Sequence, residues 1–542
     1  MTKLTLFDKK PTIIIVVAFA SLFFAALHLF FSTNENQSIS PDEKANYTFT
    51  QNLVNTENIF LKIDTEGIDR AMDLFKPRSI TYSAENQSYR LSSFYGLPFI
   101  YSFFQKFLPR FVIYCLFPII GIIAFWLILE KSFLSFRAKF YSLIVFAFHP
   151  LFVLYAARSY MHNLLFFNLF LLAIVLILYA EEQKPNLKRI FFIVSGLVYG
   201  FSLATRTTEL VWSFIFIVLL FTFLEQDRFI FKLQHALLFV LGSMLVVLPF
   251  IGISYTTSHS LIQYRILNPE TLSQTTSFFA LAKSYIFPFG VDVGKSASIF
   301  FDFFISLWWL TLPGLVGLVL LARKAFKNGI RTTLLFIGGL LLCFYLILIY
   351  GPYPQESSAG NILIGNSHFR YWIPIFLMLS YGFGFFVDFL QKHFKWFYLY
   401  LIIPLGMFSY SIYFIFFTSG GLVDIYFQNV MSARRLVLIE ETTESNSILL
   451  AGLADKYFFP DRVVAGTLMH EQRSWFVDRF LQLQTNRSVY YYHIDADISS
   501  HFTKDALEAA GVEFTYVAQF WDGGNAWEYL YKLDWPNKNG NE

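Results

Sequence analysis

The chain has 542 residues, of which 56% are apolar, 20% are aromatic and only 15% are charged. An average soluble domain has about 45–50% apolar and about 25% charged residues, so this composition excludes a soluble globular protein, a disordered chain and a collagen-like repeat. The net charge of +3 is too small to indicate a nucleic-acid partner. Cys115 and Cys343 lie in apolar runs, which indicates packing rather than a disulfide framework. Most of the chain is therefore expected to lie in lipid.

A helix needs about 20 mostly apolar residues to cross a bilayer. The sequence contains eleven such stretches, so the expected fold class is a mainly α polytopic membrane protein. They are roughly 11–31, 110–130, 138–156, 162–180, 189–205, 208–224, 234–254, 299–322, 332–350, 371–390 and 396–418. The first follows Lys9 and Lys10, as in a signal peptide, but its apolar run is long and no small-residue cleavage site follows it. These signals favour an uncleaved anchor.

Lysine and arginine in short loops set the orientation of a membrane protein. With the N-terminus inside, every predicted inside segment carries at least two of them, whereas the outside links 157–161 and 206–207 carry one each. This distribution predicts an inside N-terminus and an outside C-terminus, with a bacterial inner (cytoplasmic) membrane as the first expectation. The parts that would face outward are the loops 32–109, 255–298 and 351–370 and the tail 419–542.

The outward parts divide the chain into a membrane domain, 1–420, which includes the loop 32–109, and a small α/β domain, 421–542. In the loop, residues 43–62 have the spacing of a helix on the membrane surface, and 94–108 suits an interfacial helix. Alternating strands and helices in the tail favour an open sheet covered by helices. The expected strands are 448–453, 462–465, 489–492, 514–520 and 526–533, and the expected helices are 475–483 and 503–511.

Two adjacent carboxylates, Asp42 and Glu43, follow the first span by about ten residues. Such a pair near a surface of low dielectric constant can act as a general base or bind a divalent metal ion. The same stretch also matches an ordinary helix start, with Ser40 as the N-cap, Pro41 at the first position and acids in the first turn. The local pattern by itself favours the helix start, so these are candidate catalytic residues only in a wider context.

Three arginines fall at the outward ends of spans, namely Arg158, Arg206 and Arg370. A single arginine at that depth is explained by snorkelling to the lipid headgroups. Three that gather at one mouth would instead make a phosphate site, because a guanidinium pairs with phosphate through two parallel hydrogen bonds.

Other polar residues of the outward side extend this candidate site. The additional candidates for binding a phosphate are Arg265, Lys295 and His368, and the candidates for lining a cavity are His162, Asn163 and Tyr371. A lone histidine is more often structural, so His368 ranks below the arginines. The polar residues at the start of the fourth span also fit a plain link between two helices.

The pattern as a whole resembles the GT-C superfamily of membrane glycosyltransferases, nearest to its protein O-mannosyltransferase and aminoarabinose (lipid A) transferase group. The likeness covers roughly 1–420. It rests on Asp42-Glu43 after the first span; on Gly96-Leu97-Pro98-Phe99; on the block from His149-Pro150 through Arg158, Gly196 and Gly200 to Arg206; and on Ser367-His368-Phe369-Arg370-Tyr371 with Pro374.

The resemblance implies a polyprenyl-phosphate-linked sugar as donor, transfer on the outer face and inversion at the sugar carbon. It implies that Asp42 or Glu43 is the general base, with Arg206, Arg265 and Arg370 stabilising the leaving phosphate. Many relatives carry a second acid near the start of the fourth span. This chain has none at 160–163, so a metal or second-acid role there is in doubt. No cofactor is certain, and a divalent metal ion stays an open expectation.

Three alternatives compete with a glycosyltransferase of this kind. A transporter or flippase of a lipid-linked glycan would favour repeated halves and ionisable groups at the midplane, and the sequence shows neither. A polysaccharide polymerase or ligase would transfer sugar on another scaffold. A membrane anchor whose tail binds a partner would tolerate substitution at Asp42 and Arg370. The sequence does not identify the sugar, a hexose or a pentose, or the acceptor, which is a lipid, a glycan or a protein.

Overall fold

The structure is a computed structural model that describes most of the chain. The described residues are 9–31, 40–64, 74–75, 77–83, 87–92, 94–132, 134–223, 229–258, 286–327, 329–353, 364–394, 399–466, 473–483, 485–495, 497–521 and 527–535. Arg265, one of the predicted phosphate ligands, lies outside the described residues. The chain forms two compact units, which we call the membrane unit (Met1–Phe31, Phe107–Ile253 and Tyr264–Asp424) and the extramembrane unit (Ser32–Lys106, Ser254–Gln263 and Ile425–Glu542).

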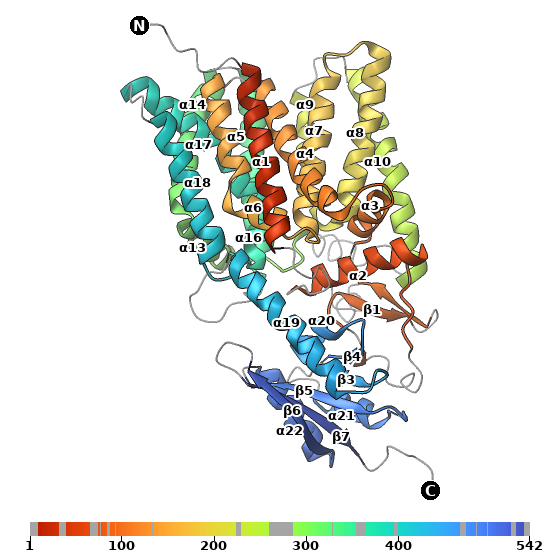
Figure 1. Ribbon diagram of the computed structural model, residues 1–542. Coiled ribbons are helices and arrows are strands. Elements are labelled where there is room, and N and C mark those ends of the chain that lie inside the picture. The colour runs from red at the N-terminus through yellow and green to blue at the C-terminus, as the bar shows by residue number, and fades with distance from the viewer. Residues whose placement is uncertain are drawn as a thin grey trace. The chain divides into compact units, whose positions relative to one another are not determined.

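The longer helices of the membrane unit run side by side, and shorter helices join them (Figure 1). They are α1 (Lys9–Phe31), α4 (Arg110–Lys131), α5 (Phe136–Ala147), α6 (Pro150–Ala157), α7 (His162–Ala180), α8 (Pro185–Thr205), α9 (Leu210–Phe223), α10 (Phe229–Ser258), α13 (Val293–Ser306), α14 (Trp308–Lys327), α15 (Ile330–Tyr350), α16 (Ser367–Tyr371), α17 (Ile373–Phe394) and α18 (Leu399–Phe417). A short 3-10 turn, η2 (Thr207–Glu209), joins α8 to α9.

Among the described residues, nine helices are long and apolar enough to cross a membrane. The pair α5 and α6 passes the same test together but bends by 44°, and the apolar helix Thr207–Thr222 is shorter than the rest. These eleven segments correspond to the eleven predicted spans. The bend falls at Pro150, because proline lacks the N–H that would continue the hydrogen-bond ladder of α5. The eighth prediction, 299–322, is broken at Leu307, where α13 ends and α14 begins.

Small residues let the helices of the membrane unit approach closely. A Cβ added to Gly317 on α14 would lie 1.8 Å from the carbonyl oxygen of Gly382 on α17. Hydroxyl groups also join neighbouring helices, since Ser195 and Ser202 on α8 donate to carbonyl oxygens of α7 at 2.8 Å and 3.0 Å. Close backbone contact and interhelical hydrogen bonds are the usual sources of packing in lipid, where burial of apolar surface gives little driving force between helices.

The extramembrane unit combines helices with two sheets. Its first part holds α2 (Pro41–Thr56), β1 (Ile80–Ser83), β2 (Ser88–Leu91) and α3 (Gly96–Gln105). Its second part holds α19 (Leu422–Thr442), whose first residues belong to the membrane unit, β3 (Ile448–Leu450), α20 (Asp455–Phe458), β4 (Val463–Ala465), α21 (Arg473–Leu481), β5 (Val489–Ile494), α22 (Ile498–Ala509), β6 (Glu513–Trp521) and β7 (Trp527–Asp534).

The sheet of the tail has the strand order β4-β3-β5-β7-β6. Strand β3 is parallel to β4 and β5, whereas β7 is antiparallel to β5 and β6. Ile448 of β3 and Val489 of β5 belong to the same hydrophobic core as Phe476 of α21 and Leu507 of α22. The predicted open sheet covered by helices is thus observed, and α22 begins five residues earlier than expected.

The loop after the first span packs with the tail rather than with the membrane helices. Leu74 and Phe75 belong to the core of the tail sheet. Arg78 forms an ion pair with Asp455 at 2.8 Å. The structure therefore groups the loop with the tail in one unit, whereas the sequence was divided at residue 420. The predicted helix at 43–62 ends at Thr56, and the sequence analysis did not predict the hairpin of β1 and β2.

The extramembrane unit is made of three separate segments of the chain, and this constrains the number of spans. A compact unit with polar strands and turns lies on one side of the membrane, so each membrane segment between its parts crosses an even number of times. Between Phe31 and Ser254 lie α4, the α5–α6 pair, α7, α8, α9 and α10. These make an even number only when the short helix α9 also crosses. Counting α9 as a span gives the odd total of eleven that the sequence predicts, whereas length and composition alone give nine spans among the described residues, or ten with the bent pair.

Candidate functional site

The two predicted catalytic acids begin helix α2 in the extramembrane unit. Pro41 occupies its first position and Asp42 and Glu43 its first turn, although the Ser40 side chain makes no capping hydrogen bond. Glu43 is buried, whereas Asp42 is half-buried. The Asp42 carboxylate accepts a hydrogen bond of 2.5 Å from the Ser79 hydroxyl. Asp42 therefore lies in the first turn of a helix and also has a carboxylate that is positioned by a hydrogen bond.

Ser79 has an unusual backbone conformation, which aims its hydroxyl at Asp42. Its φ of 66° lies in the left-handed region, which residues with a side chain rarely adopt. The neighbouring Arg78 anchors this turn through its ion pair with the buried carboxylate of Asp455. Strained residues that are held by their surroundings cluster at functional sites. The turn 78–79 thus fixes the direction of the Asp42 carboxylate.

Arg206 lies at the end of α8, in the membrane unit, as predicted. Its side chain is buried and its Nε donates to Oε1 of Glu209 at 2.5 Å. The Tyr350 hydroxyl donates to the same oxygen at 2.7 Å, and the Trp212 indole N–H donates to the other. His162 lies 3.3 Å from the Arg206 guanidinium. Glu209 thus balances the charge of Arg206 within a fully buried polar cluster.

Arg370 lies on α16 and is half-buried, in contrast to Arg206. Its guanidinium donates to the Tyr371 hydroxyl at 3.2 Å and stands 5.1 Å from the centre of the Tyr371 ring. Its backbone carbonyl accepts a hydrogen bond from the Asn163 amide at 3.4 Å. Because water and ligands reach a half-buried guanidinium more easily, Arg370 is better placed than Arg206 to receive an anion.

The ring of Tyr371 connects the two arginines. The Arg206 guanidinium lies 4.8 Å from its centre, and Tyr350 stacks on it with ring centres 4.6 Å apart. An aromatic face attracts cations through its quadrupole. The sequence placed Tyr371 only as a cavity residue, and the structure places its ring within about 5 Å of the guanidinium groups of both Arg206 and Arg370.

The remaining predicted residues lie around this cluster at different distances. His368 is buried beside Tyr353, whose ring also contacts Tyr371 at 5.3 Å. Lys295 is exposed and donates to the Pro352 carbonyl at 3.1 Å, next to Tyr353 in the sequence. These contacts place His368 and Lys295 on the periphery of the site.

Arg158 is the third arginine of the prediction, and it belongs to the surroundings of the loop before α16. Its guanidinium lies 6.0 Å from the Tyr155 ring, and the Tyr155 hydroxyl donates to the Asn366 carbonyl at 3.4 Å. A single mouth holding all three arginines stays a prediction.

Sequence reasoning missed Glu209, Trp212 and Tyr350. Glu209 was included in a predicted span, where a charged residue is rare and marks a functional site or a buried pair. A glutamate inside a predicted span was therefore the signal that could have identified Glu209. Tyr350 is 141 residues from Glu209 along the chain, so no local pattern connects them.

An apolar cavity adjoins the polar cluster at Trp212. It has a volume of about 310 Å³, and apolar side chains line nearly all of it. The lining residues come from α4, α5, α7, α9, α14, α15 and α17 and include Phe125, Phe170, Trp212, Leu346 and Pro374. A cavity with an apolar body beside a buried polar cluster suits a molecule with a hydrocarbon chain and a polar head.

Among the described side chains, no group of three potential metal ligands includes the predicted acids. The one group of three potential ligands among the described side chains lies in the tail, at His493, Asp495 and His501. The stretch from Met161 to Asn163 holds no carboxylate, and Glu209 is engaged by Arg206. A divalent metal ion at the predicted acids therefore stays an expectation.

No family model and no curated protein matches the sequence. The fold, however, is similar to that of ArnT from Cupriavidus metallidurans bound to undecaprenyl phosphate, with a TM-score of 0.57, 11% identity, and coverage of 96% of this chain and 97% of that chain. It is also similar to the Archaeoglobus fulgidus oligosaccharyltransferase tethered to an acceptor peptide, with a TM-score of 0.50, 11% identity, and coverage of 96% and 74%. The chain is an integral membrane protein with the GT-C fold.

Proposed function

We propose that the chain is a membrane glycosyltransferase that moves a sugar from a polyprenyl-phosphate carrier to an acceptor on the outer face of a bacterial inner membrane. The observation that carries this proposal is the extent of the fold likeness, which includes both units and nearly the whole length of ArnT. That enzyme was solved with undecaprenyl phosphate, a lipid of the proposed carrier class. The acceptor is a lipid, a glycan or a protein.

The membrane unit supports the binding of such a carrier. Transfer breaks the bond between the sugar carbon and the phosphate oxygen, and the bonding electrons leave with the phosphate. A preorganised guanidinium stabilises that developing charge. Arg370 is the half-buried arginine that is suited to this role, and Tyr371 and the Arg206–Glu209 pair hold its surroundings. The apolar cavity at Trp212 would accept part of the polyprenyl chain.

The extramembrane unit supplies the proposed base. Asp42 takes the proton of the acceptor hydroxyl while the acceptor oxygen attacks the sugar carbon on the face opposite the phosphate. Attack from that face inverts the configuration. The Ser79 hydroxyl orients Asp42, and Glu43 is the second candidate. A general base takes protons efficiently only when it is held in position, which the anchored turn 78–79 provides.

The test is turnover by the purified full chain in detergent with a panel of polyprenyl-phosphate sugars. Released polyprenyl phosphate and transferred sugar are both measured. We expect Asp42→Asn to lower kcat by about 100- to 10,000-fold. We expect Arg370→Ala to lower kcat/KM by about 100- to 1,000-fold. Glu57→Gln and Arg434→Ala, which change exposed residues of the same types, are the matched controls.

Three results would overturn parts of this proposal. Turnover that survives in Asp42→Asn but is lost in Glu43→Gln moves the base to Glu43. Turnover that survives all three substitutions removes the assigned residues from the site. A carrier that is moved across the membrane of a proteoliposome without chemical change makes the chain a transporter.

A further inference from the structure

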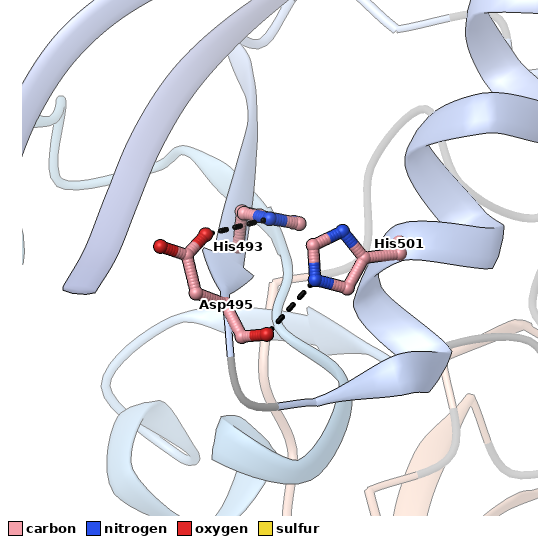
Figure 2. Close-up of side chains that lie close together, drawn as sticks. All are labelled: His493, Asp495 and His501. Carbon is pink, nitrogen blue, oxygen red and sulfur yellow. Dashed lines mark hydrogen bonds and ion pairs between the residues drawn. The ribbon is translucent and has the colours of Figure 1, made fainter. Parts of the chain in front are cut away.

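A cluster of potential metal ligands lies in the tail, where it takes no part in the proposed transfer. His493 is near the end of β5, Asp495 lies in the turn that follows, and His501 lies in the first half of α22. Figure 2 shows the three side chains grouped around that turn. One potential ligand atom from each lies within 4.8 Å of the others. The fold of the tail therefore brings a strand end and a helix together at a point rich in metal-binding groups.

The separation of the first two ligands fits a zinc ion. Nε2 of His493 lies 3.3 Å from a carboxylate oxygen of Asp495. Zinc binds nitrogen at about 2.0–2.1 Å and carboxylate oxygen at about 2.0–2.2 Å, so two ligands of one tetrahedral ion lie about 3.4 Å apart. His501 is exposed, and its potential ligand atom lies within 4.8 Å of the other two, so its ring would have to move closer to complete such a triangle.

Two of the three potential ligands, His501 and Asp495, carry hydrogen bonds of the kind that orient metal ligands. Nε2 of His501 lies 2.8 Å from the backbone carbonyl of Asp495, so that nitrogen carries the proton and Nδ1 keeps its lone pair. The Tyr529 hydroxyl hydrogen-bonds to the Asp495 carboxylate. Ligating imidazoles usually donate their other N–H to a carbonyl or carboxylate, and ligating carboxylates are themselves hydrogen-bonded.

His493 is the buried member of the cluster. Its side chain is 5% exposed, and the nitrogen that faces Asp495 is Nε2. Burial restricts the motion of this ring, so one of the three potential ligands is held in place by the packing of β5. Its ring also meets the His501 ring edge-on, with centres 4.7 Å apart.

We propose that His493, Asp495 and His501 bind one divalent transition-metal ion, with zinc as the preferred ion. Two imidazoles and a single carboxylate suit zinc, whereas calcium and magnesium prefer all-oxygen sites. Because Asp495 and His501 are exposed, a fourth coordination position is open to water or another ligand. The ion would tie β5 to α22 across their connecting turn. This site is separate from the proposed transfer chemistry and does not depend on it.

The test uses the full chain in detergent, with any affinity tag removed and bound metal stripped by a chelator. Zinc chloride is titrated by calorimetry, and bound metal is counted by mass spectrometry. We expect one zinc ion per chain and a rise in the midpoint of thermal unfolding. His501→Ala and Asp495→Asn, which change exposed residues, should each weaken zinc affinity by at least tenfold. His493→Gln should weaken it as well.

The matched control is Asp505→Asn, which removes an exposed carboxylate of α22 outside the cluster. It should bind zinc as the unchanged protein does. The proposal is overturned if the unchanged protein binds no zinc. It is equally overturned if His501→Ala and Asp495→Asn, folded by circular dichroism, bind zinc with unchanged affinity, because the ion would then lie elsewhere. Transferase activity does not enter this test, so its failure and that of the proposed function are distinguishable.

Discussion

Asp42 and Ser79 illustrate how single residues combine structural and proposed chemical roles. The first turn of α2 is a sound helix start, and the same carboxylate accepts a hydrogen bond from a residue with left-handed backbone. The local pattern by itself favoured a helix start, and the resemblance to the GT-C superfamily made the acid pair the candidate base. The sequence could not predict Ser79, because the φ angle of that residue follows from contacts of its neighbour Arg78 with the distant Asp455.

Lys44 is the next residue along α2, and it is almost fully buried, with 2% of its surface exposed. Burial lowers its pKa to about 8, although Asp461 acts in the opposite direction. An unfolded lysine titrates near 10.4. The folded protein therefore loses this proton first as the pH rises, and the stability contributed at this position increases between about pH 8 and pH 10.4.

We expect Lys44→Met to stabilise the protein at pH 7 by up to about 3 kcal/mol, since 1 pKa unit corresponds to about 1.4 kcal/mol. The gain should shrink as the pH rises towards 10, because the natural lysine is then already neutral. Thermal unfolding of both proteins in detergent, compared at each pH, measures this difference. Lys62→Met, which changes an exposed lysine of the same unit, is the control. A gain that does not depend on pH would refute the explanation.

At the scale of elements, helix α19 is tied to the tail sheet by a buried ion pair. Arg435 on α19 donates to both carboxylate oxygens of Glu528 on β7, at 2.8 Å and 2.7 Å. The Tyr492 hydroxyl of β5 also donates to Glu528 at 2.5 Å. Both charged side chains are less than 10% exposed. Removing one partner of such a pair leaves a buried charge without compensation.

We expect Glu528→Gln to destabilise the extramembrane unit by about 3–5 kcal/mol, since that is the usual cost of leaving a buried arginine uncompensated. Replacing both partners with apolar residues, as in Arg435→Met with Glu528→Leu, should restore much of the loss. Urea unfolding followed by tryptophan fluorescence measures both variants. Glu513→Gln on the exposed strand β6 is the control. Equal stability of Glu528→Gln and the unchanged protein would contradict this role of the pair.

The elements of the tail were largely predictable, and those of the first loop were not. Strands β3, β4 and β5 are short apolar runs between turn residues, and they were expected within three residues of their observed ends. Strand β1 reads Ile-Thr-Tyr-Ser and is too short and polar to give such a signal. Its hairpin is supported by long-range contacts around Tyr89, which packs against Phe459 with ring centres 5.3 Å apart.

The sequence predicted which residue types belong to the proposed site, but it did not predict which of those residues contact one another. Arginines, a tyrosine and a histidine near the outward ends of spans were identified from their depth. Which arginine is neutralised depends on Glu209, and which one is accessible depends on the packing of α16. Neither fact has a local sequence pattern, because both depend on residues that are brought together by folding.

At the scale of the whole molecule, the extramembrane unit fixes the parity of the spans. It contains residues from both before the second span and after the last. Asn55 on α2 and Glu513 on β6 must therefore lie on the same side of the membrane. Asn186, at the start of α8, must lie on the other side, because α4, the α5–α6 pair and α7 precede it.

Single cysteines at these positions test the topology in a background with Cys115→Ala and Cys343→Ala. We expect Asn55→Cys and Glu513→Cys to react with a membrane-impermeant maleimide in intact cells. Asn186→Cys should react only after the cells are permeabilised. Different labelling of Asn55→Cys and Glu513→Cys would show that α9 does not cross the membrane.

The packing of Leu74 and Phe75 into the tail core also has a consequence for biogenesis. Phe480, in the same core, is translated roughly 400 residues after Phe75. At about 5–20 residues per second, the ribosome needs about 20–80 s to cover that interval. In the predicted orientation, the first loop would cross the membrane during this time without the strands that complete its core. We expect newly made chains to need a chaperone on that side, and chains that stop before the tail to be removed by membrane proteases.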